Sequence, residues 1–119
     1  MPKLLPAHDG IIVTPMANKP DAIHHTASDF CLTYILPFIG PAGTLALHRL
    51  GAYCAGGETS WMIDELAATF GISPSVMRST LERLIAFGYI APTSTGIAVP
   101  TMIPDIPPRW RERLPEYLR

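Results

Sequence analysis

The stretch ELAATFGISPSVMRSTLERL, residues 65–84, determines the fold that this sequence predicts. Two segments with helical spacing of apolar residues meet at Gly71, where a tight turn requires the left-handed backbone that glycine adopts without strain. Ser73 is a favourable N-cap, and Pro74 suits the first turn of the helix that follows. One face of that helix carries a predicted buried stripe, consisting of Met77, Leu81 and Leu84. The stretch therefore predicts two helices joined by a tight turn.

The segments on either side extend this pattern. Pro41 starts a preceding helix, and Gly56-Gly57 ends it. Residues 58–63, ETSWMI, predict a short strand or an extended link. Residues 89–101, YIAPTSTGIAVPT, predict two short strands around a turn at 93–96. The predicted order is helix, strand, helix, tight turn, helix and two-stranded hairpin.

The two ends of the chain have a different character, with prolines and little periodicity. Residues 1–27 predict an N-terminal arm, in which residues 10–16, GIIVTPM, can form a short strand. An N-cap and a first-turn acid then open an uncharged helix over about residues 29–36, which must be buried in this domain or in a partner. Residues 102–119 are a Pro/Arg-rich C-terminal tail.

Composition limits the functions open to the chain. Its 119 residues are the size of one domain, and its net charge of −1 gives no whole-molecule field that attracts nucleic acid. Any DNA contact must therefore come from a local group of arginines. Cys31 and Cys54 lie in apolar surroundings, which predicts buried free thiols in a cytosolic protein. The apolar run at 30–47 is broken near its middle by proline and glycine, which favours two short buried helices over a membrane span.

The residues of the central stretch carry a resemblance to a known family. Glu65-Leu66-Ala67, Phe70-Gly71-Ile72-Ser73 and Phe87-Gly88-Tyr89-Ile90, together with the buried stripe, resemble the winged helix-turn-helix family over about residues 41–101. The resemblance implies a mainly α fold with a small β-hairpin wing. The expected organisation is an N-terminal arm (1–27), the winged helix-turn-helix domain with an extra N-terminal helix (28–101) and the tail (102–119).

The same resemblance implies a role in binding DNA, with the helix at 74–87 in the major groove. Arg78 is the strongest candidate, because a guanidinium can hold O6 and N7 of guanine together. Glu82 can accept from a cytosine amino group or pair with Arg78 one turn away. The expected DNA-contacting residues are Thr59, Ser60, Ser73, Ser75, Val76, Arg78, Ser79, Glu82, Arg83, Arg109 and Arg111.

Other observations favour structural roles for some of these residues. Ser73 is foremost an N-cap, and Trp61 is predicted to be a core aromatic. The wing tip has no Lys or Arg, and Val76 and Ile85 can belong to a protein interface. In the tail, Trp110 and Leu114 are expected to pin the segment to the body while its arginines face water.

The sequence therefore predicts a small DNA-binding transcriptional regulator of a bacterium or bacteriophage. It would be cytoplasmic and associated with the nucleoid. We expect a homodimer, because one such domain recognises few base pairs. The alternative is a winged-helix interaction module that does not bind DNA, with the helix at 29–36 as a possible surface for a protein partner. A minor third option is a regulator with an effector pocket near Tyr34, Tyr53 and Trp61. No Gly-rich phosphate loop, nucleophile elbow or metal-ligand spacing is present, so we expect no catalysis, cofactor, metal or membrane association.

Overall fold

The computed structural model describes residues 9–119, and its elements include two irregular or short helices labelled η. In chain order they are β1 (Gly10–Met16), β2 (Ala22–His25), η1 (Cys31–Ile35), α1 (Leu36–Tyr53), β3 (Thr59–Met62), α2 (Ile63–Phe70), α3 (Pro74–Ala86), β4 (Ala91–Pro92), β5 (Gly96–Pro100), β6 (Met102–Pro104), α4 (Pro108–Arg111) and η2 (Glu116–Leu118). From α1 to β5 the elements follow the order predicted from the sequence.

The expectation of a mainly α fold with a small β-hairpin wing is wrong. The fold is mixed, with 48% of the described residues in helices and 23% in strands. A four-stranded sheet has the order β3-β1-β5-β4, and β2 and β6 form a second, two-stranded sheet. The segment expected to be an arm thus supplies β1 to the larger sheet and β2 to the smaller one. The segment expected to be a tail supplies β6 to the smaller sheet.

The correction depends chiefly on β1, which lies in the interior of the larger sheet. This strand pairs antiparallel with β3 and parallel with β5, where Ile12 is opposite Gly96. Ile11 and Val13 are at most 1% exposed, because alternate side chains of a strand point to the same face and this face meets the helices. Covering these two side chains favours an inserted strand over a free arm.

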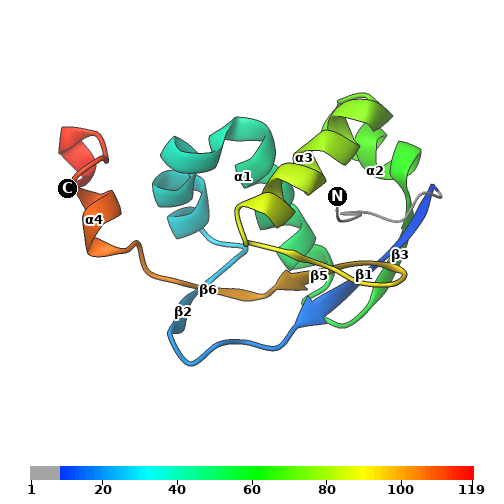
Figure 1. Ribbon diagram of the computed structural model, residues 1–119, viewed down its shortest axis with the longest axis horizontal. Helices are drawn as coiled ribbons and strands as arrows, with labels where there is room; N and C mark the ends of the chain where they lie inside the picture. Colours follow the sequence, from blue (N-terminus) through cyan, green and yellow to red (C-terminus); the bar gives the residue numbers. More distant parts are fainter. Residues whose placement is uncertain (1–8) are drawn as a thin grey trace.

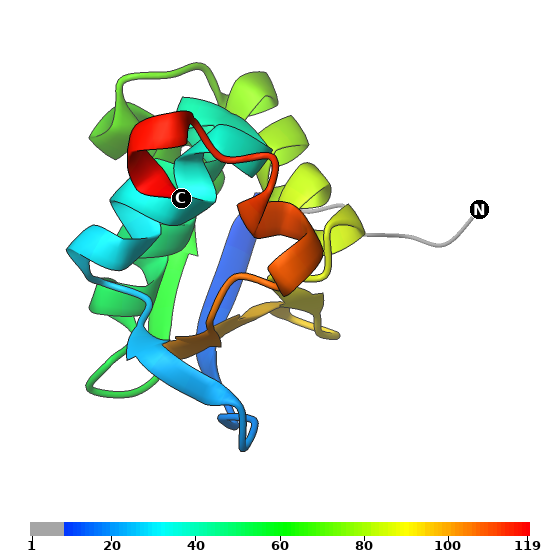
Figure 2. The ribbon, with the colours of Figure 1, turned by 90° about the vertical axis from the view of Figure 1, so that its left-hand side faces the viewer.

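The helices α1, α2 and α3 pack together over one face of the larger sheet (Figures 1 and 2). The core between them is built from residues of α1, α2 and α3 and from the inward side chains of β1 and β5. Its largest fully buried side chains include Leu47, Leu50, Ile63, Leu66, Met77, Leu81, Leu84 and Ile97. The buried stripe predicted on α3 is thereby confirmed. Burial of each such side chain stabilises the fold by about 1.5–3 kcal/mol.

The helical stretch Cys31–Tyr53 is interrupted at Gly40, whose φ of 80° lies outside the helical region. The predicted division before Pro41 is confirmed at this break, and the part before it starts with the π-helical turn η1. By length and composition alone the whole stretch could cross a membrane, a criterion that core helices of soluble proteins also meet. Here Leu47 and Leu50 belong to the core between α1 and the sheet.

The predicted burial of the cysteines and the predicted packing of Trp110 and Leu114 in the tail are confirmed. Cys31 and Cys54 are both free and buried. Trp110 of α4 packs against Phe38 with 4.8 Å between ring centroids, and Leu114 is 1% exposed. The tail therefore lies against the start of α1, at the opposite end of the molecule from α2 (Figure 1).

Candidate nucleic-acid interface

The α2–α3 hairpin is shaped by local backbone chemistry. Gly71 ends α2 with φ 72° and ψ 29°, the left-handed conformation that was predicted for it. The Ile72 N–H donates to the Ala67 carbonyl at 3.0 Å, which closes the turn. Ala67 is 1% exposed, so its small side chain lies inside the α2–α3 contact. The two helices are consequently held at a fixed relative position.

The first turn of α3 is capped as predicted. The Ser73 hydroxyl accepts a hydrogen bond from the Val76 N–H at 3.2 Å, and Pro74 occupies the first helical position. Ser73 and Ser75 hydroxyls lie 3.3 Å apart on the exposed side of this turn. The free N–H groups of a capped helix start make this end favourable for an anion such as a phosphate.

The outer side of α3 presents short side chains. Ser75 and Ser79 are exposed, and the Ser79 hydroxyl donates to the Ser75 and Val76 carbonyls, each at 3.1 Å. These bonds keep the Ser79 hydroxyl close to the helix backbone. Another molecule could therefore approach the backbone closely on this side of α3. Glu82 lies half-buried on the same side.

Arg78 does not project freely from this surface. Its guanidinium lies 3.8 Å from a carboxylate oxygen of Asp9, the first described residue of the chain, and its side chain is 27% exposed. This pairing was not anticipated, because no sequence signal links a residue before β1 to a helix near position 78. At 3.8 Å and with Asp9 80% exposed, this ion pair is weak, and it is not the only interaction that Arg78 makes.

Arg83 and Val76 flank the other edge of the exposed stripe. The Arg83 guanidinium donates a long hydrogen bond of 3.4 Å to the Ile39 carbonyl. This bond connects α3 to α1 just before the break at Gly40. Val76 is 44% exposed, and Phe87, at the C-terminal end of α3, is 53% exposed. This edge is therefore more apolar than the edge with Arg78.

The remaining expected contacts lie on separate elements. Ser60 is exposed on β3, the outer strand of the sheet, whereas the Thr59 hydroxyl accepts from the Trp61 indole at 3.0 Å. Trp61 is half-buried and packs against Tyr53, which agrees with the predicted core role. The wing turn is closed by the Thr93 hydroxyl, which accepts from the Gly96 N–H at 2.9 Å.

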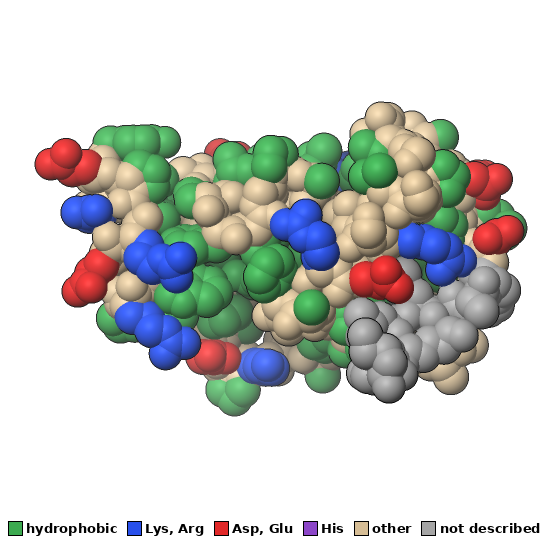
Figure 3. Space-filling view, turned by 45° about the horizontal axis from the view of Figure 1, so that its top comes forward, with side chains coloured by type: hydrophobic (Ala, Val, Ile, Leu, Met, Phe, Trp, Pro, Cys, Tyr) green, Lys and Arg blue, Asp and Glu red, His purple; other side chains and the backbone are tan. Residues whose placement is uncertain are grey.

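The arginines of the tail are not gathered beside α3. Arg111 is held by both carboxylate oxygens of Asp105 at 3.0 Å, and Arg109 is exposed on α4. The Ile106 N–H and the Arg111 guanidinium lower the pKa of Asp105, and His24 lies 3.6 Å from the same carboxylate. Figure 3 shows Lys and Arg side chains spread across one face from the tail to α3 and beyond, with Asp and Glu between them. The positive charge on this face is therefore dispersed.

A second feature near α3, a cavity at the C-terminal end of this helix, could not be predicted from the sequence. It combines short segments around Met16, Lys19, Tyr89 and Met102, and only the folded chain brings them together. Within residues 9–119, no group of three or more His, Cys, Asp or Glu side chains is placed to hold a metal ion.

The chain was compared with protein-family models, curated proteins and solved structures. No family model matches the chain, and no curated protein or solved structure matches it at a significant level.

Proposed function

We propose that this chain is a sequence-specific double-stranded DNA-binding protein that reads the major groove with α3. The main support for this proposal is the α2–turn–α3 unit, in which α3 buries Met77, Leu81 and Leu84 and leaves the side with Ser75 and Ser79 exposed. An α-helix fits the width of the major groove, and short side chains allow close approach to base edges and phosphates. The winged helix-turn-helix resemblance supports the same proposal.

Arg78 is the residue proposed to give base specificity. Its guanidinium would exchange the Asp9 carboxylate for O6 and N7 of guanine; the existing ion pair is long, and its Asp9 side is 80% exposed. Ser73 and Ser75, at the positive end of the helix, would meet backbone phosphates. The result would be specificity from few contacts and modest affinity, given the net charge of −1.

A protein of this kind would act as a small transcriptional regulator of a bacterium or bacteriophage, and we propose a homodimer that binds two half-sites. The segment around η1 supports this proposal, since Leu32 and Leu36 are 37% and 39% exposed despite their apolar character. A second subunit would cover them.

A second function has its own support. The exposure of Val76 and Phe87 on one edge of α3 favours a protein-interaction module in which this edge docks on a partner and no DNA is bound. The two functions differ in their response to salt, because binding through phosphates weakens steeply as salt rises.

The experiment is fluorescence anisotropy of the full chain with labelled random duplex at about 50 mM salt, followed by selection of a preferred site. Binding to random duplex that weakens with added salt, and selection of one site, support the proposal. No detectable binding at the lowest salt would refute DNA reading and leave the interaction module.

Arg78→Ala provides the finer test on the selected site. We expect a loss of about 1–3 kcal/mol in specific binding with the fold intact. Arg49→Ala is the matched control, because Arg49 lies over the Tyr53 ring at 5.0 Å and loses the same charge away from α3. Equal effects of the two substitutions would remove Arg78 from the set of base-contacting residues.

A further inference from the structure

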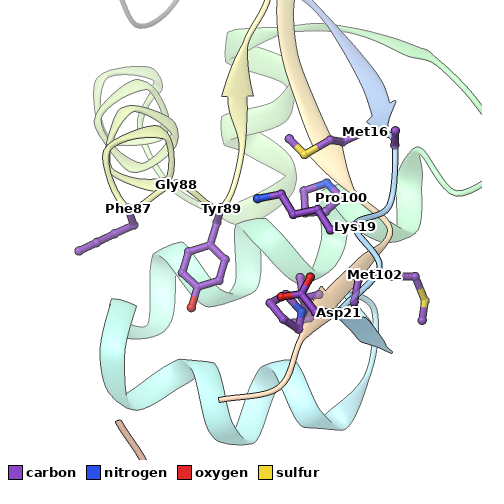
Figure 4. A pocket seen from close by; sticks show the side chains of 12 residues that line it. Met16, Lys19, Asp21, Phe87, Gly88, Tyr89, Pro100 and Met102 are labelled. Atoms are coloured by element: carbon purple, nitrogen blue, oxygen red, sulfur yellow. The ribbon is translucent and has the colours of Figure 1, made fainter. Parts of the chain in front are cut away.

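A cavity of about 150 Å³ lies where the C-terminal end of α3 meets the loop between β1 and β2. Figure 4 shows its walls, which include Met16, Tyr89, Pro100 and Met102. Burial raises the pKa of the Tyr89 hydroxyl, so this wall is a neutral phenol at physiological pH. The cavity is thus largely apolar, with one aromatic ring and the thioether of Met16, whereas the Met102 side chain turns away from Tyr89 (Figure 4). It is distinct from the region of Tyr34, Tyr53 and Trp61 in which the sequence suggested an effector pocket.

The opening of the cavity carries one cation and one anion. Lys19 and Asp21 both line it from the same loop, and both are exposed. In Figure 4 the Lys19 side chain extends toward Tyr89, with Asp21 at the same opening. Among the ion pairs of residues 9–119, none involves Lys19 or Asp21. Two unpaired opposite charges at one opening favour a ligand that carries both complementary charges.

We propose that this cavity binds a free α-amino acid with an apolar side chain of about one ring in size. The ligand's carboxylate pairs with Lys19, its ammonium group pairs with Asp21, and its side chain enters the cavity against Tyr89 and Met16. The volume sets the size of the side chain, since an engineered apolar cavity of about 150 Å³ in another protein accepts benzene. Sulfur atoms beside an aromatic ring add a favourable contact.

The charges select the class of ligand. A molecule with only a carboxylate would leave Asp21 without a partner, and a molecule with only an amine would do the same to Lys19. Because both charges are exposed to solvent, each contact strengthens binding only modestly. For a ligand of this size we expect a Kd on the order of 1 mM.

The test uses the full chain with ¹³C-labelled methionine methyl groups, observed by NMR during titration with L-phenylalanine. The methyl signal of Met16 should shift, and that of Met102 less because its side chain turns away from Tyr89, whereas those of Met62 and Met77, which do not line the cavity, should stay in place. The same titration with 3-phenylpropionate and with 2-phenylethylamine separates the two charges. Each should bind roughly two- to fivefold more weakly than L-phenylalanine.

Substitutions identify the groups responsible. Lys19→Gln and Asp21→Asn should each weaken L-phenylalanine binding by roughly two- to fivefold, and substitution of Glu58, an exposed acid after α1, by Gln should leave it unchanged. Equal binding of the three ligands, shifts of equal size at all four methionines, or no shift at about 10 mM ligand would overturn the proposal. No DNA is present in these measurements, so their outcome is independent of the proposed DNA binding.

Discussion

Substitution of Gly96 by alanine tests the placement of β1 inside the sheet. A Cβ atom on Gly96 would lie 2.2 Å from the Ile12 carbonyl oxygen and 2.6 Å from its nitrogen. Both atoms belong to the backbone, so no side-chain rotation can relieve the contact, and β1 must move away from β5. That movement weakens the 3.0 Å hydrogen bond from the Ile12 N–H to the Thr95 carbonyl and loosens the cover over Ile11 and Val13.

The size of the effect follows from these two terms. Loss of one or two net hydrogen bonds costs about 1–2 kcal/mol, and the overpacking of the strand adds about 1–3 kcal/mol. We therefore expect Gly96→Ala to lower the free energy of unfolding by about 2–5 kcal/mol, and Tm by roughly 8–20 °C for a domain of this length.

Urea and thermal unfolding followed by circular dichroism measure this change, with Gly56→Ala as the control. Gly56 has no heavy atom within 4 Å of an added Cβ and no positive φ, so its substitution should change stability by less than about 1 kcal/mol. Equal stabilities of the two variants would show that β1 does not lie against Gly96, and the four-stranded sheet described above would be incorrect.

Three further predictions concern capping, thiol reactivity and acid stability. Ser73→Ala removes the cap on the Val76 N–H and should cost about 1 kcal/mol in urea unfolding, whereas Ser94→Ala in the exposed wing turn should be neutral. Burial raises the pKa of Cys31 to about 11, so at pH 8 the thiol should resist a thiolate-directed reagent until the chain unfolds; rapid labelling of the folded chain at Cys31 would contradict its burial. Because the pKa of this thiol is raised, its contribution to stability is complete below about pH 9 and is lost as pH rises toward 11. The pKa of Asp105 is lowered, chiefly by the Ile106 N–H and then by Arg111, so its contribution is present above the ordinary carboxyl range and is lost as pH falls below about 4. Trp110 fluorescence should therefore report a local rearrangement of α4 in acid, when Asp105 no longer holds the neighbouring Arg111, and Asp105→Asn should remove most of that pH dependence.

The α2–α3 unit could be predicted from the sequence because its signals are local. Gly71, Ser73 and Pro74 each act on their own backbone, and Met77 and Leu81 are neighbours on one helix face. The same applies to the break before Pro41.

The sheet could not be predicted in the same way, because its pairings join distant segments. The strand at 10–16 was expected, but nothing in its sequence specifies β3 and β5 as its two neighbours. The strands β2 and β6 are short and contain histidine or proline, which gives no clear alternation. The Asp9–Arg78 pair and the cavity near Tyr89 also depend on this long-range assembly.

The interior position of β1 also constrains how the chain folds as it is synthesised. The strand leaves the ribosome well before its parallel neighbour β5, because α1, β3, α2 and α3 all lie between them in the chain. The helices from α1 to α3 can associate while β1 still lacks that neighbour, because their contacts are closer in sequence. Completion of the larger sheet is therefore a late event, and the apolar side of β1 must stay clear of other nascent chains until then.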